Sequence, residues 1–487
     1  MLARRLFFVQ RHVNGVKGVL GVPGWETPFS LSLGPHGSLP CLEPDCFQCP
    51  MGQNDHGGVN AARMSSGSPN ALARMSVLAA LLATLLASGC ATVPNSQTTA
   101  PFEEHLATKQ NNNLVVSVAV LTDAEAEQHF GCPLGKQDVQ AVWLKVHNQT
   151  DHPIGLLYRN MDPDYFSPFE VAYANHRPLQ NDRNRNLDEL FDQSRFPAYV
   201  EPGVTATGFV FTSRSEGAKF VSVEFWYGGG LSRDGFYMRL PSGRFDFEEA
   251  DFAKTYAPGA VKALDLAQLH QQLEELPCCT TDSSGARKGD PVNFVLIGDE
   301  DAVMGALVGQ GWDPTHVIAG HSVGLTVKSF LLGSQYRYSP VSRLFYFSRG
   351  QDLALQKVRG TIHQRNHLRL WRAPLSFQGE DVWIGQISRD IGVRFTWQSP
   401  ILVTHKIDPD VDEARDYLVQ DMFASGFLQS LAYVQGVGAA SRETPRGNLT
   451  GDPYFTDGLR AVMFIANQPV PSDQVTLIQW GEPLPQD

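Results

Sequence analysis

The pattern of hydrophobic and polar positions predicts a series of short strands after residue 113. Five stretches rich in β-branched and aromatic residues are separated by turn residues. They cover residues 114–120, 139–146, 204–212, 220–227 and 235–240. Short strands at this spacing are typical of a β-sandwich, so we predict that fold for residues 114–245.

The next segment, residues 246–290, is predicted to be a helical linker. Its apolar positions recur at near-helical spacing, as Leu266, Leu269, Leu273 and Leu276. A Ser-Gly loop follows and marks its end. We therefore expect a second domain to begin at residue 291.

Residues 291–470 mix strand and helix patterns, which predicts an α/β (α+β) domain, with a tail over 471–487. Residues 292–298 have the pattern of a buried strand and residues 301–310 that of a helix. Further strands are predicted at 341–347, 367–373, 382–388, 393–397 and 401–405. A long C-terminal helix is predicted over 408–431, with Asp408 as N-cap and Pro409 at the first helical position.

The N-terminal part carries the features of a lipoprotein leader. An apolar run at 77–86 follows Arg74 and is too short to span a bilayer as a helix, which is typical of a secretory signal. It ends in Leu86-Ala87-Ser88-Gly89-Cys90, the pattern of a bacterial lipobox, although Ala87 stands where leucine is usual. We expect a lipoprotein signal peptide over 64–89, lipid attachment at Cys90 and a polar tether over 90–113.

Two further expectations follow from this leader. A signal peptide should begin near the N-terminus, so we expect residues 1–63 to be an untranslated or wrongly assigned extension, with Met64 as the true start. Ala91 follows the cysteine, and the absence of aspartate there indicates the outer membrane of a Gram-negative bacterium. The mature protein would be a lipoprotein that faces the periplasm and contacts the membrane through its lipid anchor.

The net charge limits the classes of binding partner, and the number of cysteines limits the possible disulfides. The chain has 39 basic and 51 acidic residues, a formal charge of −12, which argues against nucleic acid as a partner. Besides the lipid-bearing Cys90, only Cys132, Cys278 and Cys279 would remain after cleavage of the leader, an odd number of thiols in an oxidising compartment. A bond from Cys132 to one of the pair is one pairing that the sequence allows.

One short motif points to a serine hydrolase. Gly320-His321-Ser322-Val323-Gly324 fits the nucleophile elbow G-x-S-x-G, after a strand-like segment and before a helix-like one. Asp352 or Asp390, followed by His405, gives the order of a catalytic triad. No loop suited to an oxyanion hole accompanies it, and a chance match at a helix start is the favoured interpretation.

Cations gather in residues 357–371 of this acidic chain. On a strand, His367, Arg369 and Trp371 share one face, so their polar groups project together and could bind a phosphate, sulfate or carboxylate. The alternative is an internal ion-pair network with Asp352, Asp381, Asp390 and the helix at Asp408. We further predict that His367, Arg369 and the start of that helix form the main polar cleft of the second domain.

Two aspartate-containing turns resemble half of a metal site. One combines His405, Asp408 and Asp410, and the other holds Asp162 and Asp164. Helix or turn capping explains these aspartates equally well. We therefore predict neither a metal nor a cofactor.

Several motifs of the second domain resemble the LssY C-terminal domain family. They are 340–346, 351–357, His367-Leu368-Arg369-Leu370-Trp371 and 405–412, with Pro277-Cys278-Cys279-Thr280-Thr281 resembling the lipoprotein members. The resemblance implies a bacterial envelope domain, found as a lipoprotein or fused to membrane proteins with a phosphatase-like domain, and it implies no particular activity. The polar positions that match the family pattern are Asp352, Lys357, Arg359, His367, Arg369, His405 and Asp408.

Two classes of function remain open at this point. The leading hypothesis is a non-enzymatic protein that binds an anionic small molecule of the envelope, or an envelope protein, through the second domain. The alternative is a hydrolase, either a serine hydrolase at Ser322 or a phosphoester hydrolase that uses His367, Arg369, His405 and Asp408. The sequence leaves open whether the protein is an enzyme.

Overall fold

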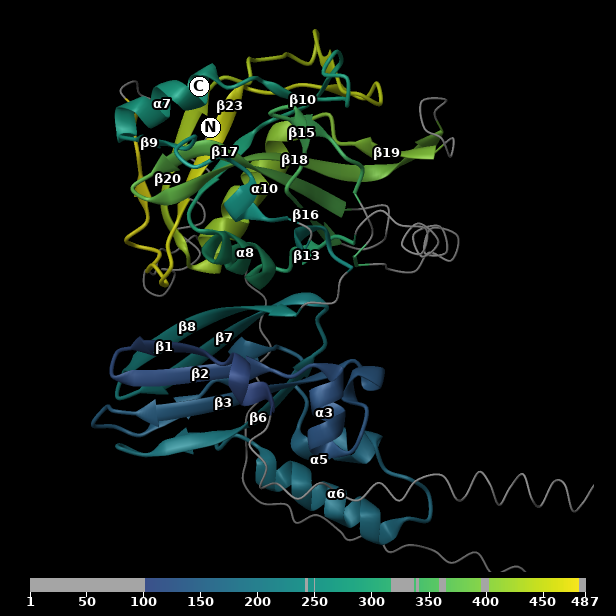
Figure 1. Ribbon diagram of the computed structural model, residues 1–487, viewed down its shortest axis with the longest axis vertical. Coiled ribbons are helices and arrows are strands. Elements are labelled where there is room, and N and C mark those ends of the chain that lie inside the picture. The colour runs from purple at the N-terminus through teal and green to yellow at the C-terminus, as the bar shows by residue number, and fades with distance from the viewer. Residues whose placement is uncertain are drawn as a thin grey trace, which may run out of the picture. The chain divides into compact units, whose positions relative to one another are not determined.

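The computed structural model describes residues 101–240, 244–248, 250–316, 337–338, 341–358, 365–395 and 403–480 (Figure 1). All of these belong to one compact unit, residues 91–483. The expected extension, signal peptide and lipid-attachment residue Cys90 lie outside the described residues. So do Ser322 and Arg359.

Two four-stranded antiparallel sheets make up the first part of the fold. Their orders are β1-β2-β3-β6 and β5-β4-β7-β8. The strands are β1 (Ala107–Asn111), β2 (Leu114–Val120), β3 (Val139–Asn148), β4 (Ile154–Leu156), β5 (Tyr199–Val200), β6 (Thr205–Ser213), β7 (Gly217–Tyr227) and β8 (Gly230–Leu240). Val116, Leu144 and Val221 come from different strands of the two sheets and lie in one buried cluster. Each of the five predicted strand segments is a strand.

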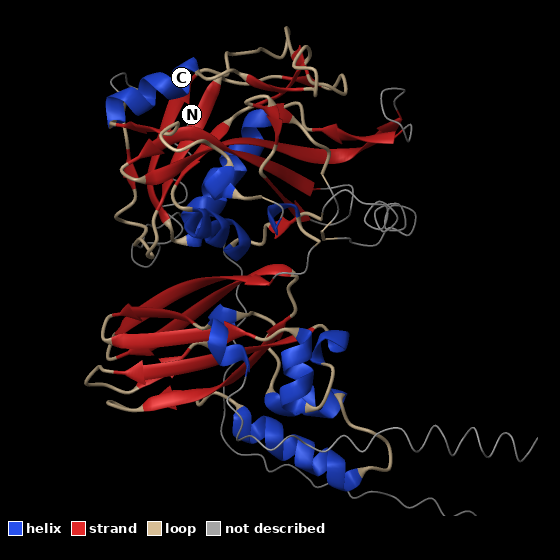
Figure 2. Cartoon of the chain, viewed as in Figure 1, coloured by secondary structure: helices blue, strands red, loops and turns tan. Residues whose placement is uncertain are grey.

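Helices that the strand pattern did not predict lie between these strands (Figure 2). They are η1 (Pro101–His105), α3 (Asp123–Phe130), η2 (Leu134–Gln137), α4 (Tyr158–Met161), α5 (Pro168–Ala174) and α6 (Asn181–Ser194). Helices α3 and α5 each begin at a capping box, Thr122 with Glu125 and Ser167 with Glu170. The predicted tether is wrong for residues 107–111, because β1 pairs there with β2.

A mixed sheet dominates the second part. Its order is β13-β16-β17-β18-β12-β23-β20-β24, with β9 beside β17 and β19 beside β18. The strands are β9 (Lys262–Leu264), β12 (Phe294–Ile297), β13 (Asp313–Pro314), β16 (Leu353–Val358), β17 (Arg365–Phe377), β18 (Glu380–Phe395), β19 (Val403–Ile407), β20 (Leu428–Gln435), β23 (Leu459–Ile465) and β24 (Thr476–Leu477). The described part of the chain is therefore mixed α/β with mainly antiparallel sheets.

Helices cover both faces of this sheet (Figure 1). Helix α7 (Leu266–Glu275) packs Leu269 and Leu273 into the cluster that holds Trp371 and Ile384 of the sheet. Helices α8 (Glu300–Gly309) and α10 (Val411–Ser425) pack against each other and contact the sheet through β23 and β18. The short elements η3 (Asp246–Glu248), η4 (Phe252–Lys254), β10 (Cys279–Thr281), β11 (Lys288–Pro291), β14 (Phe345–Tyr346), β15 (Arg349–Gly350), β21 (Arg446–Gly447) and β22 (Pro453–Tyr454) complete the described fold.

Several predicted boundaries in this part are wrong. The expected helical linker is helical only in α7 and two single turns, and its remainder contains β9, β10 and β11. The predicted strands at 382–388 and 393–397 are one continuous strand, β18. The predicted strand at 341–347 shrinks to β14, and the expected tail contains β24.

The long helix predicted over 408–431 is shorter than expected. Helix α10 ends at Gly426, which adopts a left-handed conformation with φ 75°, and β20 follows it. At the other end the N-cap is Asp410, which makes no side-chain capping bond, and Pro409 precedes the helix. The Asp408 carboxylate instead accepts a hydrogen bond from the Asp410 N–H at 3.1 Å. No helix among the described residues is both long and apolar enough to cross a membrane.

The cysteines do not pair as the sequence analysis allowed. Cys278 and Cys279 form a disulfide with each other. Cys132 is free and buried in the core around α3, where burial raises the pKa of its thiol to about 11. Its location in a different core explains why it cannot reach the pair.

The burial of Lys219 on β7 can be tested through the pH dependence of stability. Its side chain is buried, and its Nζ donates a hydrogen bond to the Ser213 carbonyl at 2.6 Å. Burial lowers the pKa of Lys219 to about 8, against an ordinary value of 10.5. Between these values the unfolded chain holds a proton that the folded chain has released, so stability rises with pH in this window.

We predict that the free energy of unfolding of the parent, minus that of Lys219→Met, increases between about pH 8 and pH 10, by at most about 1.4 kcal/mol per pH unit. Below pH 7 the difference should be constant, because both states are then protonated. Urea unfolding at a series of pH values measures it. Lys145→Met, at an exposed position of β3, is the control and should show no such slope. Parallel pH curves for the parent and Lys219→Met would contradict the prediction.

Candidate functional site

Strand β17 carries the polar side chains on which the site is built. In the β16–β17–β18 register, His367 lies opposite Gln356 and Ser388, and Arg369 lies opposite Gln386. Directly opposite residues share a face of a sheet, and alternate residues of one strand do the same. Arg365, His367 and Arg369 therefore project from one face together with their polar neighbours, as the strand pattern predicted for the last two.

His367 forms a buried pair with a carboxylate. Its Nε2 lies 2.7 Å from Asp390 Oδ2, and the two side chains are 12% and 4% exposed. Asp390 belongs to β18, so the pairing of two neighbouring strands brings them together. The sequence analysis named Asp390 as one of several acids for an ion-pair network and as one of two possible triad acids, because spacing alone did not rank it above the others.

Arg369 is buried without a direct ion pair among the described residues. Its Nη1 donates to Gln386 Oε1 at 2.7 Å, and its Nε donates to the Ser342 carbonyl at 3.1 Å. Burial lowers its pKa to about 10, against the opposing effect of Asp290 and Asp390. Arg369 thus remains a cation at neutral pH, held mainly by uncharged acceptors.

Asp290, on β11, is the second carboxylate of the site. It is buried, accepts a hydrogen bond from Asn448 Nδ2 at 2.9 Å, and its pKa is raised by burial. The sequence analysis missed it, because it lies outside the basic segment and in the expected linker. Only the fold places β11 next to β17 and β18.

Arg365 is the least satisfied cation of the site. Its side chain is 2% exposed, and its Nη1 donates to Gln356 Oε1 at 2.6 Å. Its Nε and Nη2 are buried and have no hydrogen-bond partner among the described residues. Burial lowers its pKa to about 10, with Asp390 acting in the opposite direction. Arg365 was not selected from the sequence, although it stands two positions before His367 and so shares its strand face.

The Nε and Nη2 atoms of an arginine form the edge that grips a carboxylate with two parallel hydrogen bonds. In the described part of the chain, three arginines use that edge to bind both oxygens of one carboxylate. Arg349 binds Asp352 at 3.0 and 2.6 Å. Arg337 binds Asp313 at 3.1 and 2.8 Å, and Arg214 binds Asp123 at 3.3 and 3.0 Å. Arg365 presents the same edge with no carboxylate bound to it among the residues that the structure describes.

The other deeply buried arginines have their N–H groups paired. Arg460 donates five hydrogen bonds to backbone carbonyls, those of Leu273, Leu276, Pro277, Val292 and Gly436. Arg415 is paired with Asp457 at 2.7 Å, and with Asp412 and Asp416. Both arginines therefore stabilise the fold, whereas Arg365 lacks such compensation.

The predicted seven-residue cluster is only partly assembled. Asp352 is bound by Arg349 and by the Arg372 N–H, away from His367. Lys357 points to the opposite face, where its Nζ lies 2.8 Å from Asp421 of α10. His405 lies on β19, where nothing is described of its side chain, and Arg359 lies outside the described residues.

The start of the helix at Asp408 does not supply the carboxylates near Arg369. The carboxylates of Asp412 and Asp416 serve Arg415, and the carboxylates near Arg369 are those of Asp290 and Asp390. Arg369 is only 6% exposed, so it does not line the open cleft that was predicted. Of the seven residues predicted to form a cluster, His367 and Arg369 lie on the same face of β17.

The turn aspartates that resembled metal ligands have other partners. Asp162 accepts hydrogen bonds from the backbone N–H groups of Asp164 at 2.9 Å and Ser213 at 2.5 Å. Asp408 caps the turn before α10. Within the described part of the chain, no group of three or more His, Cys, Asp or Glu side chains is placed to hold a metal ion.

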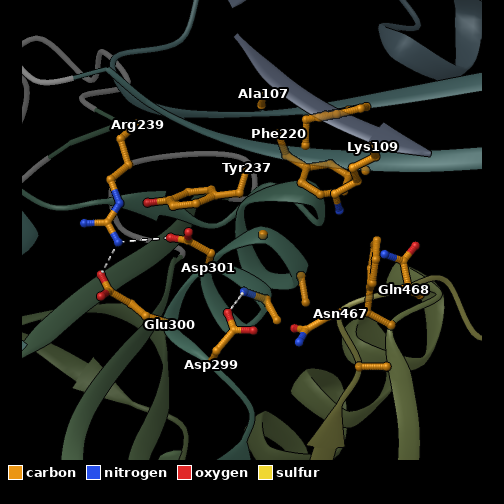
Figure 3. A pocket seen from close by; sticks show the side chains of 17 residues that line it. Ala107, Lys109, Phe220, Tyr237, Arg239, Asp299, Glu300, Asp301, Asn467 and Gln468 are labelled. Atoms are coloured by element: carbon orange, nitrogen blue, oxygen red, sulfur yellow. Dashed lines mark hydrogen bonds and ion pairs between the residues drawn. The ribbon is translucent and has the colours of Figure 1, made fainter. Parts of the chain in front are cut away.

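A pocket of about 600 Å³ lies elsewhere (Figure 3). It is lined by residues from β1, β7, β8, the start of α8 and the segment after β23, among them Lys109, Tyr237 and Asp299. Arg239 closes one side through ion pairs with Glu300 at 2.8 Å and Asp301 at 3.0 Å. None of the side chains of the β17 site lines this pocket.

Comparison with known proteins gives one assignment. Residues 271–459 match the model of the family described as LssY C-terminus. The match begins inside α7, so the domain starts about twenty residues earlier than the sequence pattern predicted. It covers β17, β18, the disulfide pair and Asp290. No curated protein matches the chain.

The difference between the buried arginines generates a prediction on stability. Arg460→Met should lower the free energy of unfolding by about 3 kcal/mol or more, because five carbonyls lose their donor. Arg365→Met should leave it within about 1 kcal/mol of the parent, or raise it, because the change removes a buried charge and two unpaired N–H groups. Urea unfolding without added anions measures both. An equal loss in the two variants would contradict the assignment of Arg365 as uncompensated.

Proposed function

Residues 271–459 belong to the LssY C-terminus family, and on that premise we propose that this domain binds an anionic component of the bacterial envelope. The binding group is the guanidinium of Arg365. The observation that carries the proposal is its buried Nε and Nη2 edge, which has no acceptor among the described residues. An oxyanion of the ligand would accept both hydrogen bonds.

Energetics favours an oxyanion at this position. A buried donor without an acceptor costs about 1–3 kcal/mol, and a carboxylate or phosphate would offset that cost at two donors at once. Arginine is suited to such planar, two-bond recognition. The ligand is therefore expected to present a phosphate or carboxylate group, carried by a small envelope molecule or by an envelope protein.

The local charge balance also supports an anion. Arg365 and Arg369 bring two positive charges. The negative charge of Asp390 acts on both and opposes the lowering of their pKa values by burial. Asp290 holds its proton more strongly than an ordinary carboxyl group, because it is buried. The two arginines thus match the two aspartates in number, and the raised pKa of Asp290 weakens one of the negative charges that an added oxyanion would meet.

Phosphate should raise the unfolding midpoint of the parent in a thermal-shift assay, because a ligand that binds only the folded state stabilises it. Arg365→Met should abolish the shift, since it removes both donors. Arg287→Gln, at a surface ion pair of the same domain with a 66% exposed arginine side chain, should respond like the parent. Sulfate, glycerol phosphate and divalent chlorides complete the screen. Equal phosphate shifts in the parent and Arg365→Met would sink the proposal.

A phosphoester hydrolase is the second candidate, and the His367–Asp390 pair favours it. A carboxylate orients an imidazole that can act as a general base or nucleophile. The version that used Asp408 loses support, because that carboxylate caps a turn. Incubation with 4-nitrophenyl phosphate separates the candidates: turnover that disappears in His367→Gln favours the enzyme, and phosphate binding without turnover favours the binding protein.

We also propose that the protein is an outer-membrane lipoprotein, anchored at Cys90. In this arrangement the two N-terminal sheets form a β-sandwich between the anchor and the family domain. The shared core of the two sheets supports the sandwich, and the lipobox pattern supports the anchor. Two or more acyl chains would hold the protein stably at the membrane.

Cys90→Ser should release the protein from the membrane, because it removes the thiol that carries the lipid. Fractionation of cells that express the full chain measures the release, and incorporation of a labelled fatty acid measures the modification. Cys132→Ser, at a buried free cysteine, is the control and should remain in the membrane fraction. A Cys90→Ser variant that stays in the detergent-extracted membrane fraction would contradict the anchor.

A further inference from the structure

The disulfide between the adjacent residues Cys278 and Cys279 lies at the start of β10. We propose that it is a redox site, reduced by a dithiol, whose reduction weakens oxyanion binding on β17. This inference rests on the proposed function for its effect on binding. The pairing of β10 with β11 and the contacts of both strands support the redox site itself.

The disulfide conflicts with regular strand geometry. Successive side chains of a strand point to opposite faces, so two neighbouring residues joined through their side chains cannot both follow the pleat. Strand β10 begins only at Cys279, and its register with β11 shifts between Cys279 and Thr281. The bonded pair therefore coincides with the irregular end of this strand pair.

Strand β10 is connected to the polar strand face through β11, which contacts β18. Thr280, the residue after the disulfide, is fully buried, and its Oγ1 donates to the Asp290 carbonyl at 3.1 Å. Asp290 is one of the two carboxylates that act on Arg369. A change at Cys279 therefore reaches the site through a single residue and its hydrogen bond.

The chain before the disulfide is fixed. The Pro277 carbonyl accepts hydrogen bonds from Arg460 Nη2 at 2.7 Å and from Tyr346 Oη at 2.8 Å. The Cys278 carbonyl accepts one from the Val292 N–H at 2.8 Å. Because this side is held by a buried arginine and a strand, relaxation after reduction is directed toward Thr280 and Asp290.

A dithiol is the reductant in this redox step. Cys278 is partly exposed, whereas Cys279 is buried. A thiolate of the reductant attacks Cys278 Sγ, the Cys278–Cys279 bond breaks, and the Cys279 sulfur leaves as a thiolate that takes up a proton. The second thiol of the reductant then releases Cys278, so two electrons and two protons pass to the protein and the reductant becomes a disulfide.

Reduction removes the restraint on the pleat. Cys278 and Cys279 can then turn to opposite faces, which shifts Thr280 and the Asp290 backbone that it holds. The Asp290 carboxylate then exchanges its hydrogen bond with Asn448 for an ion pair with Arg369, which has no direct ion pair among the described residues of the oxidised form. Such a pair would lower the positive charge that attracts the oxyanion.

Phosphate binding to the oxidised and the dithiothreitol-reduced full chain tests the inference. The dissociation constant should increase at least about fivefold on reduction, and mass spectrometry should find two additional alkylatable thiols. Cys132→Ser should respond like the parent. The Cys278→Ser, Cys279→Ser double variant should bind weakly in both conditions and show no response to the dithiol.

Hydrogen exchange of the unaltered chain is the second measurement, in case the double variant fails to fold. Faster exchange at residues 279–281 and 288–291 after reduction supports the redox site, even if phosphate binds in neither state and the proposed function fails. Arg365-dependent phosphate binding that is equal in the two redox states would overturn the inference and leave the proposed function intact. Unchanged exchange would overturn it as well.

Discussion

The pairing of β17 with β18 is the constraint on which the second part of the structure depends. These two long strands fix which side chains share a face, and a shift by one residue would exchange the two faces. In the observed register, Leu368 and Ile387 are fully buried on one face, with Lys357 of β16 directed to Asp421 of α10 on that side. The opposite face receives Arg365, His367 and Arg369. The fold thus places a polar row inside a sheet that is otherwise packed on both faces.

Buried arginines show how differently one side chain can be used in one domain. Arg460 replaces the water that it loses with five backbone carbonyls, and it thereby ties α7, the segment before β10 and β23 together. The buried charge of Arg415 is compensated by carboxylates instead. Within the described ranges, Arg365 has one acceptor, the amide oxygen of Gln356, so its position in the core is costly. A cost of this kind at one residue is more readily explained by ligand binding than by stability.

The disulfide pair, β11 and the polar row form a continuous arrangement. Thr280 connects the first two, and Asp290 connects β11 with Arg369. The first link is a buried hydrogen bond of 3.1 Å, and the second is the electrostatic effect of one buried charged group on another. This continuity joins the adjacent cysteines, which the sequence analysis placed in a linker, to the chemistry of the domain.

The sequence by itself determined the elements that depend on local pattern. The strand runs of the first part, the helix at α8, the buried leucines of α7 and the shared strand face of His367 and Arg369 all follow from the spacing of side chains along the chain. The capping boxes of α3 and α5 were readable in the same way but were missed. Tertiary structure decided the partners: Asp390, Gln386 and Asp290 reach the site from other strands, and Cys132 is held apart from Cys278 and Cys279. The physical reason is that spacing fixes the direction of a side chain, whereas its compensation depends on which distant strand is paired beside it.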